Sequence, residues 1–325
     1  LSILGLGLIF VPGLCPTIGG AKRWVPIGPV AVQPSEFAKL GLVVYLASFL
    51  ACVKHGIRDW RSGLFWALLP LIVIAGLTMG QPDMGPTLVL TGVTLAMIYM
   101  AGAKKEHMAV ILVAGFLLGV VLIAIEPYRL QRVISFIDPF KDYHGAGYQV
   151  CQSLIALGSG GPIGVGLCEG RGKLFYLPAE HTDFIFAVLG EEMGLIGTLG
   201  LLLLFLGVGW RGFYIASRTK QDFGRLLTGG ISALICGQAF LNMAVVTSTV
   251  PATGVPLPFI SYGGSSLISN LICMGLLLGI SRYPGLVENY ENATRSNRGR
   301  DGGARVSGNR NRRSSSNRPK TSALR

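Results

Sequence analysis

Long apolar runs recur along the chain, and they limit its fold more than any other feature of the sequence. A helix needs ~20 apolar residues to cross a bilayer, and in lipid only helices and closed barrels satisfy all their backbone groups. Half of the 325 residues are hydrophobic and only 14% are charged, against roughly 25% in soluble domains. We therefore predict an all-α polytopic membrane protein with eight spans, the first one partial: 1–14, 37–53, 63–79, 87–102, 108–125, 194–210, 226–247 and 263–281.

Lys and Arg residues in the short connections predict the orientation of these spans, because cytoplasmic loops are enriched in them. Basic residues lie between spans two and three, four and five, and six and seven, and again after span eight. This side is predicted to be cytoplasmic, so the remaining connections face outward: 15–36, 80–86, 126–193 and 248–262. The chain begins inside an apolar run without a methionine, and we expect it to be the middle of a longer protein.

Composition divides the chain into a transmembrane domain, 1–283, and a basic tail, 284–325. Residues 285–325 carry ten Lys or Arg against three Asp or Glu, and they are rich in Ser, Asn, Arg and Gly. Such a polar segment is typical of disorder. We interpret it as a solvated cytoplasmic tail near anionic lipid or a protein partner, in preference to a nucleic-acid-binding region.

The six cysteines show no Cys-x-x-Cys or Cys/His ligand spacing, which disfavours a zinc site. Cys151 and Cys168 share the long outer segment, and the sequence leaves open whether they pair.

The segment 177–186 carries the strongest signal of chemistry. It brings Glu180, Asp183 and one of only four histidines, His181, close to the apolar run that begins at 195. Charges at the mouth of a span are costly to place, and partial desolvation raises the pKa of a carboxyl toward that of a useful general base. Asp183 is therefore the candidate catalytic residue. The alternative is that Thr182 or Asp183 only caps the helix that begins at Phe184.

Basic residues on the predicted outer face break the charge rule, and an anionic, lipid-linked substrate would account for them. They are Lys22, Arg23, Arg129, Arg132, Arg171 and Lys173. Lys39 lies one turn into span two, where it must snorkel or face a polar cavity. Its structural and functional roles are equally open, whereas Ser35 and Glu36 just before it fit a helix start.

Three further stretches are expected to be irregular. Residues 81–86 form a turn with Asp83 capping the next helix, and the glycines of 158–161 let the backbone approach a lipid headgroup or re-enter the membrane edge. Residues 251–258 contain three prolines, so they must be buried in protein or line a cavity. Gln238 and Asn242 would face that cavity, more as helix–helix hydrogen bonds than as substrate ligands.

In series, these motifs resemble the SEDS family (shape, elongation, division and sporulation). The resemblance covers roughly residues 1–283, and it is carried by 20–24, 33–36, Lys39, 81–83, Tyr128, Arg129, Arg132, Gln149, 152–153, 158–161, 177–178, 181–184 and 251–266. Within the family, 256–266 is most similar to the cell-division member, and the elongation member is the nearest alternative. The resemblance implies ten spans in the full-length protein.

It also implies a peptidoglycan glycosyltransferase of the outer face of the cytoplasmic membrane, acting at the division septum. The implied substrate is lipid II, an undecaprenyl diphosphate-linked disaccharide pentapeptide, and the implied partners are an FtsI-like class B penicillin-binding protein and other divisome membrane proteins. The essential aspartate of the family matches Asp183, and its functional lysine matches Lys39. Glu180 stands one place from the usual glutamate, and Cys168, Gly170 and Gly172 replace three residues of the usual pattern.

On this hypothesis Asp183 is the general base for the acceptor hydroxyl, and cations stabilise the departing diphosphate. Candidate cations are Lys39, Arg23, Arg129, Arg132 and Lys173; further candidate substrate-binding residues are Glu36, Gln149, His181 and Ser261. No cofactor is certain, although a divalent cation, Mg²⁺ or Mn²⁺, could share the charge. A lipid II flippase is the main alternative, and a scaffold that only holds the penicillin-binding protein is a third.

Overall fold

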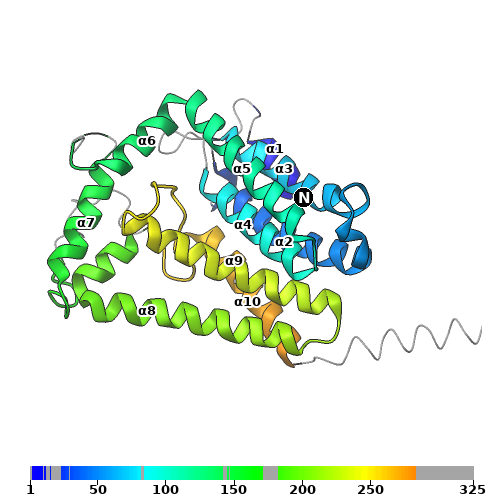
Figure 1. Cartoon of the computed structure of the whole chain (residues 1–325). Helices are drawn as coiled ribbons and strands as arrows, with labels where there is room; N and C mark the ends of the chain where they lie inside the picture. Colours follow the sequence, from blue (N-terminus) through cyan, green and yellow to red (C-terminus); the bar gives the residue numbers. More distant parts are fainter. Residues whose placement is uncertain are drawn as a thin grey trace, which may run out of the picture. The chain divides into compact units, whose positions relative to one another are not determined.

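The computed structural model describes residues 2–9, 11, 15, 23–28, 30–81, 84–141, 145, 147–170 and 182–282. The predicted tail and the predicted cap Asp83 lie outside them. The described chain is mainly helical (Figure 1), and its ten α-helices are α1 (Ser2–Leu8), α2 (Pro34–Val53), α3 (Phe65–Met79), α4 (Met84–Met100), α5 (Lys105–Ile125), α6 (Pro127–Ile137), α7 (Tyr148–Gly160), α8 (Ile185–Arg218), α9 (Asp222–Val246) and α10 (Gly264–Arg282). A 3₁₀ turn, Lys54–Arg58, and a π turn, Trp60–Leu64, join α2 to α3.

The eight predicted spans correspond in order to α1 to α5 and α8 to α10. In the part of the chain that the structure describes, six helices are long and apolar enough to cross a membrane, and α4 is apolar but shorter, at 17 residues. The prediction of a polytopic helical membrane protein is therefore confirmed. The first helix has only seven residues, and the helices α6 and α7, between spans five and six, were not predicted.

Helix α9 is the centre of the bundle. It packs against α2, α4, α8 and α10, and 72% of its 18-residue apolar stretch is buried. Small residues permit this: added Cβ atoms at Gly229 and Gly230 would lie 2.6 and 2.7 Å from the sulfurs of Met100 and Met97 on α4. Close approach over small residues is how helices associate in lipid, where no hydrophobic effect drives them together.

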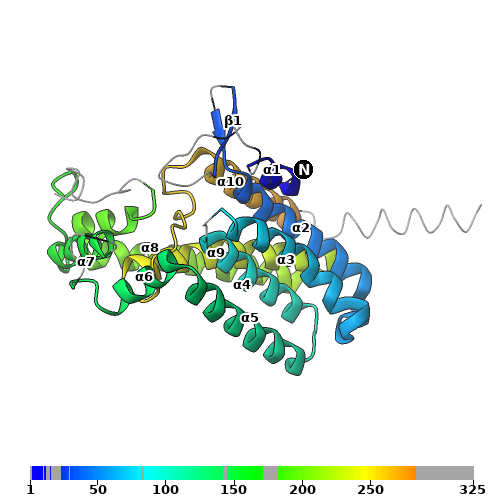
Figure 2. The same cartoon turned by 90° about the horizontal axis from the view of Figure 1, so that it is seen from above.

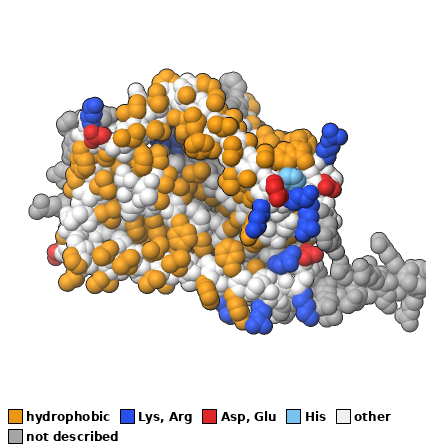
Figure 3. Space-filling view, in the orientation of Figure 1, with side chains coloured by type: hydrophobic (Ala, Val, Ile, Leu, Met, Phe, Trp, Pro, Cys, Tyr) orange, Lys and Arg blue, Asp and Glu red, His pale blue; other side chains and the backbone are white. Residues whose placement is uncertain are grey.

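The flanks of the bundle are apolar, and most of the charged side chains visible in Figure 3 gather at one end, with a few at the other. Helix α5 has no buried side chain, and Phe116 on α5 and Trp210 on α8 are 71% and 80% exposed. In a membrane, lipid covers such a surface, whereas in water it would be an aggregation liability. The basic end is formed by the connections that follow α2, α4 and α8 and by the adjoining turns of α5, α8 and α9, with exposed Arg58, Arg61, Lys104, Lys105, Arg211, Arg218, Lys220 and Arg225.

A short hairpin precedes α2. Its strands β1 (Val25–Ile27) and β2 (Val30–Val32) pair antiparallel, with Pro26 opposite Ala31. It lies beside the start of α10 (Figure 2), where the backbone N–H of Gln33 donates to the Ser265 hydroxyl at 3.0 Å. The hairpin and the start of α10 therefore belong to the same end of the bundle, opposite the basic connections.

A kink at Gly194 divides α8 into a short helix and a long span. The residue has φ 63° and ψ −159°, a region populated almost only by glycine. The interrupted helix leaves backbone groups without helical partners, and the loop after α7 binds them. The amides of Leu195 and Ile196 donate to the carbonyls of Gly161 and Pro162, at 2.9 and 3.2 Å.

The same loop gives the role of the 158–161 glycines. Cβ atoms added to Gly160 or Gly164 would clash with the backbone carbonyls of Gly190 and Glu192. The expectation that these glycines approach a lipid headgroup or re-enter the membrane is corrected for Gly160, because it lets α7 pack directly against the start of α8. Cys151 and Cys168 are both free thiols, the first buried and the second exposed.

Candidate functional site

Asp183 lies in the turn that leads into α8, and the carbonyls of Thr182 and Asp183 accept hydrogen bonds from other elements. The Nδ2 group of Asn242 on α9 donates to the Asp183 carbonyl at 2.7 Å. The Ser261 hydroxyl donates to the Thr182 carbonyl and accepts the Leu257 amide at 2.7 Å. The N-cap of α8 is Phe184, without a side-chain cap, so the alternative that Thr182 or Asp183 occupies the cap position is wrong.

The side chain of Asp183 is half-buried and lies near two cations and the backbone of Gly254. Burial raises the pKa of the Asp183 carboxyl above its usual range, and the guanidinium groups of Arg23 and Arg132 oppose that rise. A Cβ added to Gly254 would lie 3.4 Å from Oδ2 of Asp183, so the backbone of Gly254 faces the carboxylate. Two predicted cations, Arg23 and Arg132, are thus brought to the predicted base.

The segment 251–261 forms one wall of the site. As predicted from its prolines, it is not helical, and it packs against α9 and the Asp183 turn. Its carbonyls accept bonds from distant side chains: Nη1 of Arg132 reaches Ala252 O at 2.9 Å, and Asn242 reaches Val255 O at 2.7 Å. The segment therefore joins Arg132, the Asp183 turn and α9.

Lys39 lies in a buried network next to this wall. Its ammonium group pairs with the Glu36 carboxylate at 2.9 Å and donates to Oε1 of Gln238 at 2.7 Å. Lys39 and Glu36 are each 2% exposed. The snorkelling alternative for Lys39 is therefore wrong in this conformation, because the ammonium group is enclosed by α2 and α9. A buried charge of this kind needs such partners, since leaving it unpaired costs several kcal/mol.

The remaining predicted residues are more scattered. Arg129 is buried, and its guanidinium donates to Leu122 O and Met79 O, both at 3.1 Å, which ties the end of α5 to the end of α3. Gln149 lies in the first turn of α7, half-buried. Lys22, Arg171, Lys173, Glu180 and His181 lie outside the described residues.

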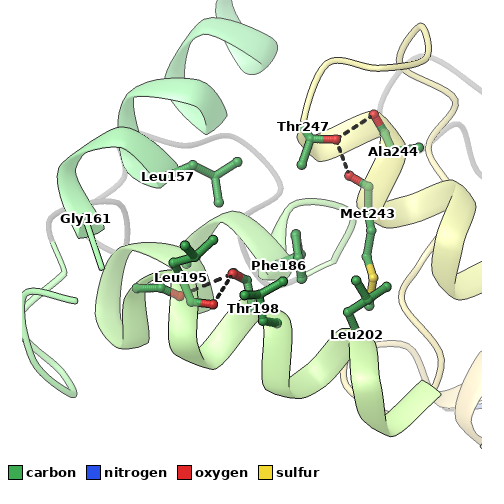
Figure 4. A pocket seen from close by; sticks show the side chains of 12 residues that line it. Leu157, Gly161, Phe186, Leu195, Thr198, Leu202, Met243, Ala244 and Thr247 are labelled. Carbon is green, nitrogen blue, oxygen red and sulfur yellow. Dashed lines mark hydrogen bonds between the residues drawn. The ribbon is translucent and has the colours of Figure 1, made fainter. Parts of the chain in front are cut away.

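An apolar cavity of about 390 Å³ opens between α7, α8 and α9 (Figure 4). Leu157, Phe186, Leu195 and Met243 line it, and the Thr198 hydroxyl donates to carbonyls of its own helix, at 3.0 and 3.3 Å. Phe186 follows Asp183 by three residues. The cavity suits an apolar group and supplies no acid–base chemistry of its own.

A divalent metal ion would need several carboxylate, imidazole or thiolate side chains close together. Among the described residues, no three His, Cys, Asp or Glu side chains lie close enough to hold a metal ion.

Sequence reasoning undervalued Gln238 and Asn242. Gln238 does make a helix–helix bond, to Lys39 on α2, but both side chains also bind the backbone of 255–256. The available signal was their spacing of one helical turn directly before a proline-rich segment, whose carbonyls lack regular partners.

These features define a class: a polytopic helical membrane protein with a half-buried carboxylate near two arginines, at the end of the bundle opposite its basic connections. The chain belongs to the FtsW/RodA/SpoVE family of cell cycle proteins, whose model matches residues 1–285. The predicted SEDS family is thereby confirmed.

Individual relatives agree. The chain is 41% identical over 278 residues to stage V sporulation protein E of Bacillus subtilis (strain 168), covering 86% of this chain and 76% of that protein. It is 43% identical over 277 residues to the probable peptidoglycan glycosyltransferase FtsW of Geobacter sp. (strain M18), covering 84% and 75%.

Solved structures share the fold. One, described as "Structural coordination of polymerization and crosslinking by a peptidoglycan synthase complex", has a TM-score of 0.72 and 32% identity, covering 88% of this chain and 80% of that chain. The rod shape determining protein RodA of Thermus thermophilus has a TM-score of 0.60 and 29% identity, covering 87% and 76%.

Proposed function

We propose that this protein is a peptidoglycan glycosyltransferase that polymerises lipid II, with Asp183 as the general base. The observation that carries the proposal is the half-buried Asp183 carboxylate, which faces the backbone of Gly254 and lies near Arg23 and Arg132. Relatives that are about 40% identical over most of the chain bear the name probable peptidoglycan glycosyltransferase, and the reaction requires these two kinds of group.

In the proposed reaction, the 4-hydroxyl oxygen of the acceptor sugar attacks C1 of the donor sugar. The hydroxyl proton passes to the Asp183 carboxylate, the O4–C1 bond forms, and the bond from C1 to the diphosphate breaks. The electron pair leaves with undecaprenyl diphosphate, whose charge is stabilised by cations. A raised pKa suits Asp183 to this role, because a base near the working pH both holds its charge and accepts a proton readily.

The contacts divide the predicted cations. Lys39 and Arg129 bind internal partners, whereas Arg23 and Arg132 lie close enough to Asp183 to lower its pKa. Because of this proximity to the proposed base, the proposal gives contact with the diphosphate to Arg23 and Arg132. Lys173 and His181 stay candidates for the substrate, as do Gln149 and Ser261, the latter through the turn it binds. Glu36 serves to neutralise Lys39. Mg²⁺ or Mn²⁺ remains a candidate that only a chelation assay would test.

The setting is also proposed. The reaction would occur on the outer face of the cytoplasmic membrane at the division septum, with the tail 284–325 in the cytoplasm. One similar structure is described as coordinating polymerisation with crosslinking, which supports a crosslinking partner of the class B penicillin-binding protein type within the divisome. Localisation of tagged full-length protein to the septum or to the side wall distinguishes a division role from an elongation role.

The test is glycan synthesis from lipid II by the full-length protein and its partner in detergent, where sidedness is absent. We expect wild-type protein to make polymer and Asp183→Asn protein to make less by at least about 100-fold. The matched control is Asp222→Asn at the basic end, where Asp222 pairs with Arg225 at 3.0 Å, and it should stay active. Absence of polymer from wild type would favour a flippase, and full activity of Asp183→Asn would refute the base.

A further inference from the structure

The segment 251–258 has no regular secondary structure that would bond its own carbonyl groups. Three prolines remove backbone donors, and it forms neither helix nor strand. Its carbonyls therefore need partners from elsewhere, and side chains of α9 supply two of them. Pro256 O accepts Nε2 of Gln238 at 2.9 Å, and Val255 O accepts Nδ2 of Asn242 at 2.7 Å.

Asn242 connects this wall to the Asp183 turn. Its Nδ2 group has two hydrogens, and it donates to both Val255 O and Asp183 O, each at 2.7 Å. The residue is 1% exposed, so water does not compete for these bonds. Gly254, next to Val255, is the residue whose backbone faces the Asp183 carboxylate. One amide thus fixes the turn and the wall against each other.

Gln238 makes the matching connection one turn earlier on the same face of α9. Its Nε2 donates to Pro256, and its Oε1 accepts the Lys39 ammonium at 2.7 Å. Gln238 is also 1% exposed. Consecutive residues of the wall, Val255 and Pro256, are therefore tied to the Asp183 turn and to the buried ion pair through two amides of one helix.

We propose that Gln238 and Asn242 are positioning residues. They hold residues 254–256 of the wall against the Asp183 carboxylate, which fixes the direction of the carboxylate and limits the access of water to it. Neither touches substrate; each acts through the backbone it binds. The inference rests on the proposed function of Asp183. It also assigns the Lys39–Glu36 pair a purpose within the fold, because Lys39 orients the Gln238 amide by occupying its oxygen.

The test measures the pH dependence of kcat/KM for lipid II polymerisation, with unfolding temperature recorded in parallel. In Asn242→Ala the wall loosens and more water reaches the half-buried Asp183 carboxylate, so the acid limb of the profile should move to lower pH. We expect kcat to fall about 10- to 100-fold, because a misplacement of 1 Å costs up to that much, and KM to change less than about 2-fold. Gln238→Glu keeps the acceptor for Lys39 but loses the donor to Pro256, and should shift the limb in the same direction.

The matched control is Asn270→Ala. Asn270 is an equally buried amide, on α10, and it donates to Ser266 at 3.2 Å. It should change stability without moving the limb. If Asn242→Ala does not fold, Gln238→Glu decides the question. If the folded variants keep the acid limb of the wild-type pH profile while Asp183→Asn is inactive, the positioning role is refuted and the proposed base is not. An active Asp183→Asn refutes the proposed base, and the positioning role with it.

Discussion

Replacing Gly194 by alanine should destabilise the protein, because this residue forms the kink of α8. Two costs add. The conformation at φ 63° and ψ −159° is strained for any residue with a Cβ, by about 1–3 kcal/mol. The new Cβ would also clash with the Gly164 amide nitrogen and lie 2.7 Å from backbone atoms of Ile163. Since backbone cannot rotate away, overpacking adds about 1–3 kcal/mol.

The sum, roughly 2–6 kcal/mol, is a large share of the 5–15 kcal/mol that usually stabilises a protein. Thermal unfolding in detergent should show a clear loss for Gly194→Ala. The control is Gly200→Ala on the same helix, where no atom outside the helix lies within 4 Å of the added Cβ, and there we expect no loss. Activity should fall as well, because the kink directs the short helix that begins at Ile185. Equal unfolding temperatures for the two variants would show that the kink is not required.

Three further predictions concern charge. Asp183→Asn should raise the unfolding temperature at neutral pH. Folding raises the pKa of the Asp183 carboxyl, so the ionised carboxylate destabilises the fold increasingly as pH rises above the ordinary Asp pKa of about 3.9. A lower unfolding temperature contradicts this. Arg132→Gln removes a cation that lowers this pKa, so the acid limb of kcat/KM should move to higher pH; a shift to lower pH would exclude that electrostatic role. Lys39→Met should cost about 3–5 kcal/mol by stranding the buried Glu36 carboxylate, and Lys39→Met with Glu36→Gln should cost less; additive losses in thermal unfolding would rule out the coupling.

The membrane helices were predictable because their signal is local. Each span is a run of apolar residues, and the predicted bounds fall on helices in the correct order. The sixth span was predicted to begin at 194, where the structure has the Gly194 kink. The helices α6 and α7 were missed because neither is long and apolar enough to resemble a span. In α6 the exposed apolar residues Leu130, Ile134 and Ile137 do repeat at helical spacing, which was the available signal.

The contacts of the site were not predictable, because they depend on how distant helices meet. Lys39 and Gln238 are 199 positions apart and share one hydrogen bond. Nothing in the residues near Arg129 indicates that it binds the carbonyl of Met79, 50 positions earlier. Both Arg129 and Arg132 were predicted to bind substrate because of their charge. In the structure Arg129 donates to carbonyls of α3 and α5, whereas Arg132 donates to the wall beside Asp183.

The polar interior of the bundle explains why these contacts can support catalysis. Glu36, Lys39, Gln238 and Asn242 are almost completely buried in a protein whose flanks face lipid. Each would cost free energy there unless bonded, so the low-energy arrangement is one in which the Lys39 ammonium, the Glu36 carboxylate and the amide N–H groups of Gln238 and Asn242 have specific partners. Groups fixed in this way need not reorganise when charge moves between acceptor and diphosphate, which is how a protein lowers the barrier for such a step. The hydrogen bonds that the burial of these groups requires therefore also hold the Asp183 turn in place for the reaction.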